Sequence, residues 1–363
     1  MKVKVVHFAI SETFGGIESF LYEIYKRSND ENIQMEFVAV GYKNGNVNKF
    51  REIGATVNVV SERNNLGRYK ADVTEVFSCY QSEQLKNGQK VIIHFHKNSA
   101  TDMTAIRIAK KLGLKIIVHS HNTAPSTGNL TKLLHVINRQ QLRRTADYKV
   151  ACSKAAAEWM FKSCDNVRII YNGIDTNRFR PNKENRSLIR DELGIPQDSV
   201  AIVCVGRFTK QKNQLWLIDF MGLAIQYNVY LILIGEGELK ERCMREAEER
   251  GLISNIRFLG HRNDIPDLLN ASDVFILPSL YEGYPISALE AQACGLKTFL
   301  SDRITKEVDV TGAVRWFPLT QKFEQIVEMI FDKNVSRQKN SSSYDLNSTY
   351  RNVQTLYYEI INV

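Results

Sequence analysis

The chain has 363 residues, of which 44% are hydrophobic and 24% charged, as expected for a globular protein of about two domains. No apolar run approaches the roughly 18 residues of a membrane-spanning helix, and the apolar start, residues 1–10, is too short for a signal peptide. The formal net charge of +8 favours an anionic partner and leaves a phosphorylated substrate, an acidic membrane surface and a nucleic acid open.

Short β-branched segments alternate with longer amphipathic segments in the first half of the chain, which is typical of βαβ units around a parallel sheet. We expect strands at residues 3–10, 35–40, 57–60, 91–95, 116–119, 148–152 and 167–171. The helices expected between them cover residues 17–27, 68–85, 101–112, 130–145 and 154–163.

The alternation stops at residues 172–199, which are polar and turn-rich apart from one short helical piece, so we predict a linker there. It resumes with strands expected at residues 201–205, 229–234, 256–259, 274–277 and 298–301. The helices expected in this half cover residues 214–226, 238–250, 265–270, 286–294 and, after a charged and serine-rich stretch, 347–361. The pattern predicts two doubly wound α/β units in tandem, with ligands in a cleft at the carboxyl ends of the strands.

The six cysteines are scattered, with no C-x-x-C pair and no histidine at metal-ligand spacing. We interpret them as buried or incidental thiols of a protein kept in a reducing cytoplasm.

The first expected strand leads into the loop SETFGG, which places Gly15 and Gly16 directly before a helix. Glycines at such a turn let a phosphate approach the backbone N–H groups at the positive end of the helix. An ordinary tight turn has the same pattern, so this signal is weak by itself. Because the loop is not G-x-G-x-x-G and no Walker A motif occurs, the sequence does not favour a nicotinamide or flavin dinucleotide.

Two histidine pairs, His94 with His96 and His119 with His121, lie where strands are expected to end. H-x-H in a strand places both rings on one face, but no carboxylate or cysteine at ligand spacing completes a metal site at either pair. A lone histidine is usually structural, whereas one beyond a strand end is placed for proton or phosphate contacts. We therefore favour His121 as a functional residue and expect no metal.

In the second half, VCVGRFTKQKNQ places Arg207 and Lys212 between a strand and a helix. Two cations beside the N–H groups of a helix start can clamp a diphosphate. Solvated charge is the commoner fate of a single Lys or Arg, but the glycine directly after the strand favours the clamp. No D-x-D pair occurs, so the usual carboxylate route to a bridging divalent metal is missing.

The stretch SLYEGYPISALEAQACG holds two carboxylates, Glu282 in the turn before an expected helix and Glu290 inside that helix. Each alone has an ordinary structural explanation: Glu282 would be a negative charge near a helix start, and Glu290 would be a carboxylate on the helix surface. Both together beside the cationic loop favour a site that grips the two ends of one ligand.

These motifs resemble those of the retaining, GT-B-fold glycosyltransferases of family 4, whose signature is E-x7-E. The resemblance extends over nearly the whole chain through G-G-I-E, H-S-H-N, Y-N-G-I-D, G-R-F-x-K-Q-K-N, I-G-E-G and S-D-V-F-I-L-P-S. Two departures are mild, because Gln292 replaces a usual Met and Asn213 a usual Gly, and neither has an inferred polar role.

The resemblance implies a GT-B fold, with two Rossmann-like domains facing a central cleft. Residues 1–171 would form the acceptor-side domain and residues 172–346 the nucleotide-sugar-binding domain, with the C-terminal helix 347–363 packing back on the first. The residues implied in catalysis are His121, Arg207, Lys212 and Glu282. The residues implied in donor binding are Gly15, Gly16, Arg207, Lys212, His261, Arg262, Glu282, Gly283, Tyr284, Pro285, Ile286 and Glu290.

By this resemblance, Arg207 and Lys212 would hold the diphosphate, and Glu290 would bind the ribose. Glu282 and the loop that follows it would contact the donor sugar. Gly15 and Gly16 lie against the donor phosphate, His121 lies near the reacting sugar, and the loop of His261 and Arg262 contacts the base.

The implied activity is that of a retaining hexosyltransferase (EC 2.4) that needs no cofactor or metal. It would move a sugar from a nucleotide donor, most simply a UDP-sugar, to a carbohydrate or lipid-linked saccharide in surface, capsular or exopolysaccharide biosynthesis. A UDP-sugar epimerase of the same fold and a non-catalytic nucleotide-sugar-binding protein remain alternatives. Nucleic acid is not favoured, because the basic residues do not gather with aromatic residues into a stacking platform.

One basic segment, residues 131–149, carries Lys132, Arg139, Arg143, Arg144 and Lys149 among apolar residues. We expect weak, salt-sensitive contact with an anionic membrane, at the inner face of the plasma membrane, where a lipid-linked acceptor would lie. A solvated helix face with a few positive charges explains the segment about equally well.

Overall fold

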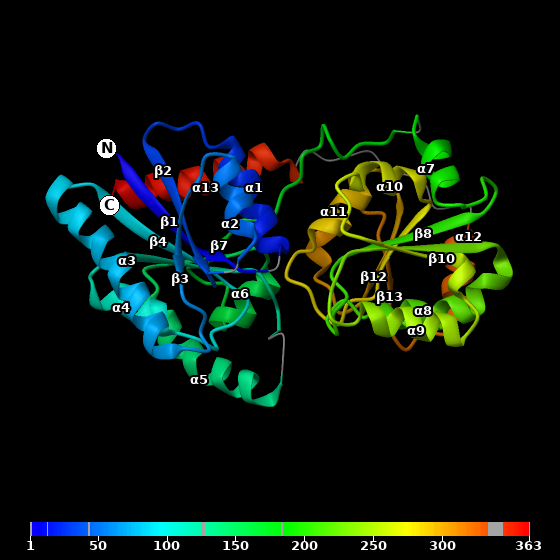
Figure 1. Ribbon diagram of the computed structural model, residues 1–363, viewed down its shortest axis with the longest axis horizontal. Coiled ribbons are helices and arrows are strands. Elements are labelled where there is room, and N and C mark those ends of the chain that lie inside the picture. The colour runs from blue at the N-terminus through cyan, green and yellow to red at the C-terminus, as the bar shows by residue number, and fades with distance from the viewer. Residues whose placement is uncertain are drawn as a thin grey trace. The chain divides into compact units, whose positions relative to one another are not determined.

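The structure is a computed structural model that describes residues 2–12, 14–42, 44–124, 128–182, 184–332 and 344–362 (Figure 1). The chain divides into two compact units. Unit 1 comprises Met1–Gly173 and Leu346–Val363, and unit 2 comprises Ile174–Asp345. The predicted domain boundary after residue 171 lies two residues before this division.

Unit 1 is built on a seven-stranded parallel sheet in the order β3-β2-β1-β4-β5-β6-β7. Its strands are β1 (Val3–Ile10), β2 (Ile33–Val40), β3 (Thr56–Val60), β4 (Lys90–Lys97), β5 (Lys115–Ser120), β6 (Tyr148–Ala151) and β7 (Arg168–Ile169). Its helices are α1 (Gly16–Arg27), α2 (Asn46–Glu52), α3 (Leu66–Asn87), α4 (Thr104–Lys111), α5 (Asn129–Thr145), α6 (Lys154–Phe161) and α13 (Leu346–Ile361).

Unit 2 is built on a six-stranded parallel sheet in the order β10-β9-β8-β11-β12-β13. Its strands are β8 (Val200–Val205), β9 (Val229–Ile234), β10 (Ile256–Gly260), β11 (Val274–Leu277), β12 (Lys297–Ser301) and β13 (Arg315–Phe317). Its α-helices are α7 (Arg186–Glu192), α8 (Gln214–Ala224), α9 (Lys240–Glu249), α10 (Ile265–Ala271), α11 (Ile286–Ala293) and α12 (Phe323–Phe331). Three short 3₁₀ helices, Ile225–Tyr227, Ile253–Asn255 and Lys306–Val308, complete it.

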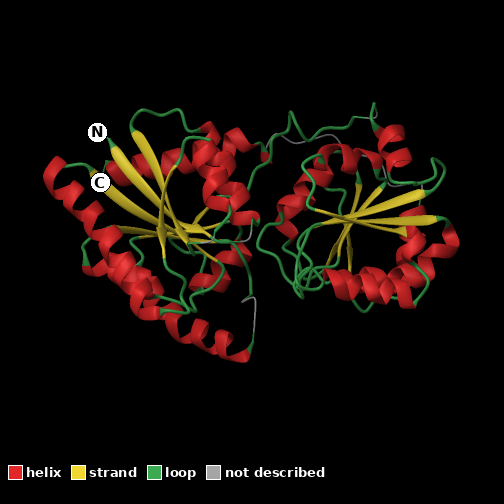
Figure 2. Cartoon of the chain, in the orientation of Figure 1, coloured by secondary structure: helices red, strands yellow, loops and turns green. Residues whose placement is uncertain are grey.

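Helices cover both faces of each sheet, as Figure 2 shows in red around the yellow strands. In unit 1 this explains why the strands are almost continuously apolar: along β1, Val5 packs into the cluster under α1 and α13, and Val6 packs into the cluster under α3 and α4. Both units have the Rossmann-like doubly wound arrangement, and the predicted α/β fold class is confirmed.

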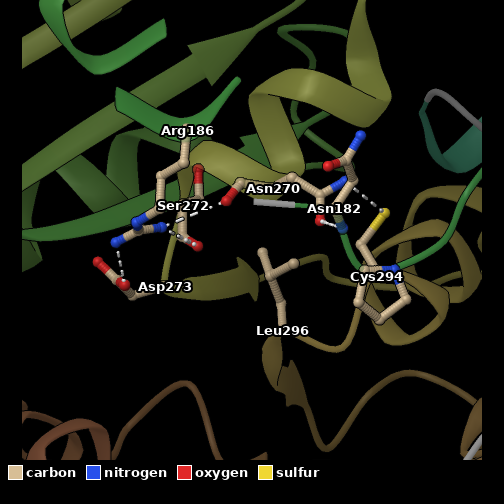
Figure 3. Close-up of a pocket in the computed structure, with 8 residues that line it drawn as sticks. Asn182, Arg186, Asn270, Ser272, Asp273, Cys294 and Leu296 are labelled. Carbon is tan, nitrogen blue, oxygen red and sulfur yellow. Dashed lines mark hydrogen bonds and ion pairs between the residues drawn. The ribbon is translucent and has the colours of Figure 1, made fainter. Parts of the chain in front are cut away.

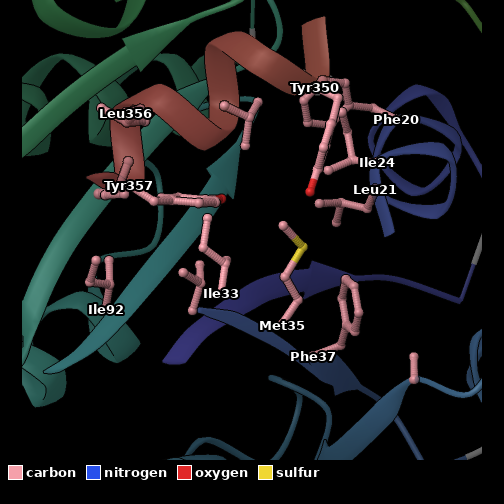
Figure 4. Packing of buried hydrophobic residues seen from close by; sticks show 14 of the residues in the cluster. Phe20, Leu21, Ile24, Ile33, Met35, Phe37, Ile92, Tyr350, Leu356 and Tyr357 are labelled. Carbon is pink, nitrogen blue, oxygen red and sulfur yellow. The ribbon is translucent and has the colours of Figure 1, made fainter. Parts of the chain in front are cut away.

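The C-terminal helix α13 belongs to unit 1, although the whole of unit 2 separates it in sequence from the rest of that unit (Figure 1). Tyr350, Leu356 and Tyr357 pack against residues of α1 and β2, including Phe20 and Met35 (Figure 4). Burying such side chains gives about 1.5–3 kcal/mol each, so α13 is an integral part of this core.

Several predicted elements need correction. The linker expected at residues 172–199 is mostly part of unit 2, because α7 lies within it and Arg190 of that helix is fully buried. Its guanidinium donates to the carbonyls of Ala271 and Ser199 at 2.9 and 3.0 Å and pairs with Asp273 at 2.6 Å. A polar composition therefore concealed a packed segment.

The strand expected at residues 167–171 is only two residues long as β7, and α2, α12 and β13 were not predicted. No helix among the described residues has the length and apolar character needed to cross a bilayer.

Candidate functional site

The loops that follow β8 and β11 meet at the carboxyl edge of the unit 2 sheet. The backbone N–H of Leu280 donates to the carbonyl of Gln211 at 2.8 Å, and the Asn213 side chain donates to the carbonyl of Pro278 at 3.2 Å. These bonds join the predicted cationic loop to the predicted acidic loop.

Glu282 is the centre of this junction, and its side chain is buried. The Nζ atom of Lys212 lies 2.7 Å from its Oε1 atom, which also accepts a hydrogen bond from the Ser279 hydroxyl at 2.8 Å. The Gln211 amide donates to Oε2 at 3.2 Å. Burial leaves this carboxylate few positions, so it holds Lys212 at the end of β8.

Arg207 lies in the same loop, and its side chain is exposed. Within the described residues, its guanidinium has no hydrogen-bond or ion-pair partner, so all its donors are open to a ligand. The side chains of Arg207, Lys212 and Glu282 sum to a charge of +1, and the Lys212 ammonium keeps further N–H donors beyond the one that faces Glu282.

Glycines allow the loop after β8 to fold closely on itself and to approach the loop after β9. A Cβ on Gly206 would lie 3.1 Å from the Lys212 Cε atom, and a Cβ on Gly235, whose φ is +140°, would lie 2.3 Å from the Gly206 carbonyl oxygen. The backbone N–H of Gly206 bonds to Ile234 at 2.9 Å. The close approach therefore fixes the backbone from which Arg207 projects.

Helix α11 begins directly after the acidic loop, with Pro285 at its N-cap and no side-chain cap. Glu290 lies within α11 and is half-buried, while Gly283, Tyr284 and Pro285 are buried in the loop before it. The structure thus keeps the predicted order of Glu282, helix start and Glu290.

The loop after β10 carries the two residues predicted to contact a base. His261 is exposed, but the Arg262 guanidinium is engaged by Asp264 at 2.6 and 2.8 Å and by Glu192 at 3.1 Å. These carboxylates raise the pKa of Arg262, the Asp264 hydrogen bond most of all. Arg262 therefore orders the loop, with most of its N–H donors already engaged.

In unit 1 the glycine loop after β1 holds a carboxylate that the sequence prediction missed. Buried Glu18 accepts hydrogen bonds from the Ser11 and Gly15 backbone N–H groups, both at 3.0 Å, and from the Ser11 hydroxyl at 2.6 Å. The backbone N–H of Gly15, which was predicted to contact a phosphate, thus already donates to Glu18. Gly16 is exposed and has open space around its Cα. A glutamate three residues after the N-cap is the capping-box signal that could have revealed this contact.

His121 follows β5 directly and belongs to a cluster of histidine rings. Its Nε2 atom lies 2.8 Å from the His96 Nδ1 atom, and the His96 Nε2 atom lies 3.0 Å from the His7 Nδ1 atom. The prediction considered only carboxylates and cysteines as further metal ligands, and the structure instead brings other histidines to each pair. The strand register brings His7 to His94 and His96, and His96 to His119 and His121, with one ring nitrogen from each residue of a trio within 4.8 Å of the others.

A separate pocket of about 220 Å³ lies at the opposite end of the unit 2 strands (Figure 3). It is lined by Asp273 and Leu296, which directly precede β11 and β12, and by Arg186. The Arg186 guanidinium is already bonded to the carbonyls of residues 270–272 and to Asp273, at 2.6–3.2 Å. The charged groups that line this pocket, Arg186 and Asp273, already bind each other, so this pocket is not the candidate site.

Comparison with known proteins identifies the family. The model of Glycosyltransferase Family 4 matches residues 14–178, and that of Glycosyl transferases group 1 matches residues 185–312. A Bacillus subtilis protein named as glycosyltransferase EpsF is 29% identical over 337 residues, covering 90% of this chain and 86% of that protein. An Escherichia coli UDP-Gal:alpha-D-GlcNAc-diphosphoundecaprenol alpha-1,3-galactosyltransferase is 29% identical over 243 residues, covering 64% of this chain and 62% of that enzyme.

Solved structures agree on the fold. Anabaena HepE in complex with UDP and glucose superposes with a TM-score of 0.81 at 19% identity, covering 98% of this chain and 99% of that one. Sucrose-phosphate synthase of Thermosynechococcus elongatus superposes with a TM-score of 0.76 at 15% identity, covering 99% and 100%. With two family models matching one after the other along the chain, this protein belongs to the GT-B-fold glycosyltransferases of family 4 and is a glycosyltransferase.

Proposed function

We propose that this glycosyltransferase transfers a sugar from a UDP-sugar to a saccharide or lipid-linked saccharide acceptor, with retention at the anomeric carbon, in surface polysaccharide biosynthesis. The observation that carries the proposal is the cationic edge of unit 2, where Arg207 is free and Lys212 is held by Glu282. The names of relatives support the substrate class, because one uses UDP-Gal and a diphosphoundecaprenol acceptor and another was crystallised with UDP-glucose.

In this proposal, Arg207 and Lys212 contact the diphosphate. A guanidinium offers a fork of N–H donors, and the ammonium of Lys212 donates at a fixed point beside it. Glu282 orients Lys212 and faces the donor sugar, with the loop of Gly283, Tyr284, Pro285 and Ile286 after it. Glu290 accepts from the ribose hydroxyls.

The chemical step breaks the bond between the anomeric carbon and the phosphate oxygen, and the bonding electrons leave with UDP. The acceptor oxygen bonds to the anomeric carbon from the same face, and its proton passes to the departing phosphate oxygen. Arg207 and Lys212 stabilise the charge that develops on that phosphate, so the step needs no bound metal. His121 is assigned to the reacting sugar, and Gly16 to the donor phosphate with Gly15 as its structural neighbour.

The test is release of the nucleoside diphosphate, UDP or GDP, from a panel of UDP- and GDP-sugars, with and without saccharide acceptors, in the presence of EDTA. The proposal expects one UDP-sugar to release UDP with the anomeric configuration retained in the product, as read by NMR. An inverted product refutes the retaining mechanism, and loss of activity with EDTA refutes metal independence. An epimer formed without acceptor supports the epimerase alternative, and binding without turnover supports the non-catalytic one.

We also propose that unit 1 rests on an anionic membrane through α5. The exposed large apolar residues of this helix share one side at helical spacing: Leu130, Leu133, Leu134, Val136 and Ile137. The buried residues His135 and Leu142 face the core instead. Exposed Lys132, Arg143 and Arg144 add positive charge, and an apolar stripe flanked by cations fits the interface of an acidic bilayer.

Lys149, which was predicted within the same basic segment, lies in β6 and is half-buried, so it is not part of the helix surface. Flotation with phosphatidylglycerol vesicles tests the contact. We expect recovery at low salt that falls at high salt, and no recovery with neutral vesicles. Absence of the protein from the acidic vesicles at low salt refutes it.

A further inference from the structure

The histidines of unit 1 form an ordered array on one face of its sheet. Along β1, β4 and β5, alternate residues on the face under α1 and α13 begin as apolar side chains and end as histidines near the carboxyl edge. The three series are Val3, Val5 and His7; Ile92, His94 and His96; and Ile117, His119 and His121. Period-two alternation and parallel register therefore bring five of the seven histidines of the chain into one cluster.

Three of these rings form a continuous hydrogen-bonded chain. The His7 Nδ1 atom lies 3.0 Å from the His96 Nε2 atom, and the His96 Nδ1 atom lies 2.8 Å from the His121 Nε2 atom. His94 bonds instead to the Tyr357 hydroxyl at 2.8 Å. Only His121 is less than fully enclosed, so the chain runs from the core to the surface at the end of β5.

The rings are neutral. Burial lowers the pKa of His7 and of His121 to about 3, and lowers the pKa of His96 well below its usual value. A neutral imidazole carries one ring proton, so each hydrogen bond in the chain needs one ring to donate and the next to accept. The three protons must therefore all be on the same ring nitrogen, either on Nδ1 in every ring or on Nε2 in every ring.

A bound metal ion explains the distances between the ring nitrogens less well than hydrogen bonds between the rings do. Two ligands of a tetrahedral zinc ion, each at about 2.0–2.1 Å, lie about 3.3 Å apart, whereas the paired nitrogens here lie 2.8 and 3.0 Å apart. Each trio also consists of histidines alone, so an ion would bring an uncompensated double charge into the core.

The buried end of the chain favours one direction for these hydrogen bonds. The Nε2 atom of His7 is buried without a hydrogen-bond partner. Buried N–H groups without an acceptor are rarer in proteins than acceptors without a donor, so the proton of His7 belongs on Nδ1. His7 then donates to His96, and His96 donates through Nδ1 to the Nε2 atom of His121.

We propose that His7 and His96 are positioning residues that lock His121 in the tautomer with its proton on Nδ1. The Nδ1 atom of His121 is not among the buried ring nitrogens without a partner, and the described residues offer it no hydrogen bond. His121 therefore presents a fixed N–H donor, suited to a hydroxyl or phosphate oxygen of the substrate. This inference rests on the proposed function only for what the donor binds.

Two amide variants of His96 separate the two ends of the chain. In His96→Asn the side-chain amide replaces Nδ1 and can still donate to His121, whereas in His96→Gln it reaches toward the Nε2 position and faces His7. Both variants lose the ring and differ by one methylene, so each is the structural control for the other. Long-range ¹H–¹⁵N spectra of ¹⁵N-labelled protein at pH 7 report which nitrogen carries the proton, with the His121 signals assigned from His121→Gln.

We expect Nδ1 protonation of His121 in the wild type and in His96→Asn, and a shift toward Nε2 protonation in His96→Gln. In the UDP-release assay, His96→Gln should lose about ten- to a hundredfold in kcat with little change in KM, and His96→Asn should recover most of it. Failure of the wild type to use any nucleotide sugar refutes the proposed function, while the spectra still test the histidine chain.

Three results overturn the inference. One is Nε2 protonation of His121 in the wild type, which decides the matter even if neither variant folds. Another is the same tautomer and the same kcat in both His96 variants. The third is stoichiometric uptake of Zn²⁺ by the wild type that His7→Asn abolishes, which would assign the cluster to a metal.

Discussion

Unit 1 and unit 2 share the strand order 3-2-1-4-5-6 counted within each sheet, with one further strand in unit 1, yet the carboxyl edges of the two sheets carry different chemistry. In unit 1 this edge holds buried neutral histidines, and burial lowers the pKa of each ring in the cluster. In unit 2 it holds exposed Arg207 and the Lys212–Glu282 ion pair.

Under the proposed function, this difference would let one fold separate two tasks. Charges placed near the surface with open donors suit the binding of an anion, since little desolvation is required before the ligand arrives. Neutral rings buried in a sheet suit the presentation of a single donor in fixed orientation, since the surrounding core holds them. The predictions that follow test this contrast, beginning with the largest effect.

Mild acid should unfold unit 1 before unit 2. The pKa of His7 and of His121 is about 3 in the folded state and about 6.5 when unfolded, so the unfolded chain binds more protons between these values. The contribution of these two histidines to the free energy of unfolding is fully present above pH 6.5 and is lost as the pH is lowered. At pH 5 the loss is about 2 kcal/mol for each of the two histidines.

Hydrogen exchange read by mass spectrometry at pH 7 and pH 5, corrected for intrinsic rates, measures this loss in each unit separately. Unit 2 has one histidine, exposed His261, and carboxylates with lowered pKa values, such as Asp264, matter only below about pH 4. Equal protection of unit 1 at both pH values would contradict the assignment of buried neutral rings.

Arg207→Ala should lower kcat for sugar transfer by about a hundredfold, because the charge that stabilises the departing phosphate is lost. The free energy of unfolding should change by less than about 0.5 kcal/mol, since the side chain is exposed. Lys210→Ala, an exposed cation in the same loop, is the matched control and should keep its activity. Equal activities of the two variants would remove Arg207 from the site.

Gly235→Ala should destabilise unit 2 by roughly 2 kcal/mol, because the residue has a φ of +140° and its Cβ would lie 2.3 Å from the Gly206 oxygen. Turnover should fall as well, since Gly206 precedes Arg207. Gly222→Ala is the control: it lies in α8 with open space around it and should stabilise by up to about 1 kcal/mol. Thermal unfolding of both variants decides whether the close loop packing is real.

The smallest effect concerns the surface of α5. Replacing Leu133 and Ile137 by serine should reduce binding to phosphatidylglycerol vesicles by about tenfold, since each exposed side chain gives up apolar burial in the interface. Turnover with a water-soluble acceptor should stay the same. Leu188 in α7 is a similarly exposed leucine, and Leu188→Ser should leave vesicle binding unchanged. An equal loss of vesicle binding in Leu188→Ser and in the α5 variant would indicate non-specific hydrophobic adsorption.

The sequence predicted the strands best where apolar runs are continuous and turns are marked. β1, β9 and β11 have the predicted bounds, because buried parallel strands leave an unbroken apolar signal. β13 and α2 were missed because they are short, three and seven residues, and such segments contain little periodicity. The linker prediction failed at Arg190, whose burial depends on carbonyl partners distant in sequence.

The candidate site divides in the same way. Lys212 and Glu282 were both predicted from their loops, and the structure brings them together at 2.7 Å. Ser279 and Gln211, which fix that pair, were missed because their role exists only once the two loops meet. The histidine array was missed because it needs the register between β1, β4 and β5, which one sequence does not give.

The central claim is that the cationic edge of unit 2 binds the diphosphate of the donor. Titration calorimetry with UDP tests it directly, using the wild type, Arg207→Ala, Lys212→Ala and the control Lys210→Ala. We predict that UDP binds the wild type and Lys210→Ala equally, and that each of the other two variants binds at least about tenfold more weakly, as expected from the loss of a charge-assisted hydrogen bond. Equal affinity in all four proteins would contradict the account.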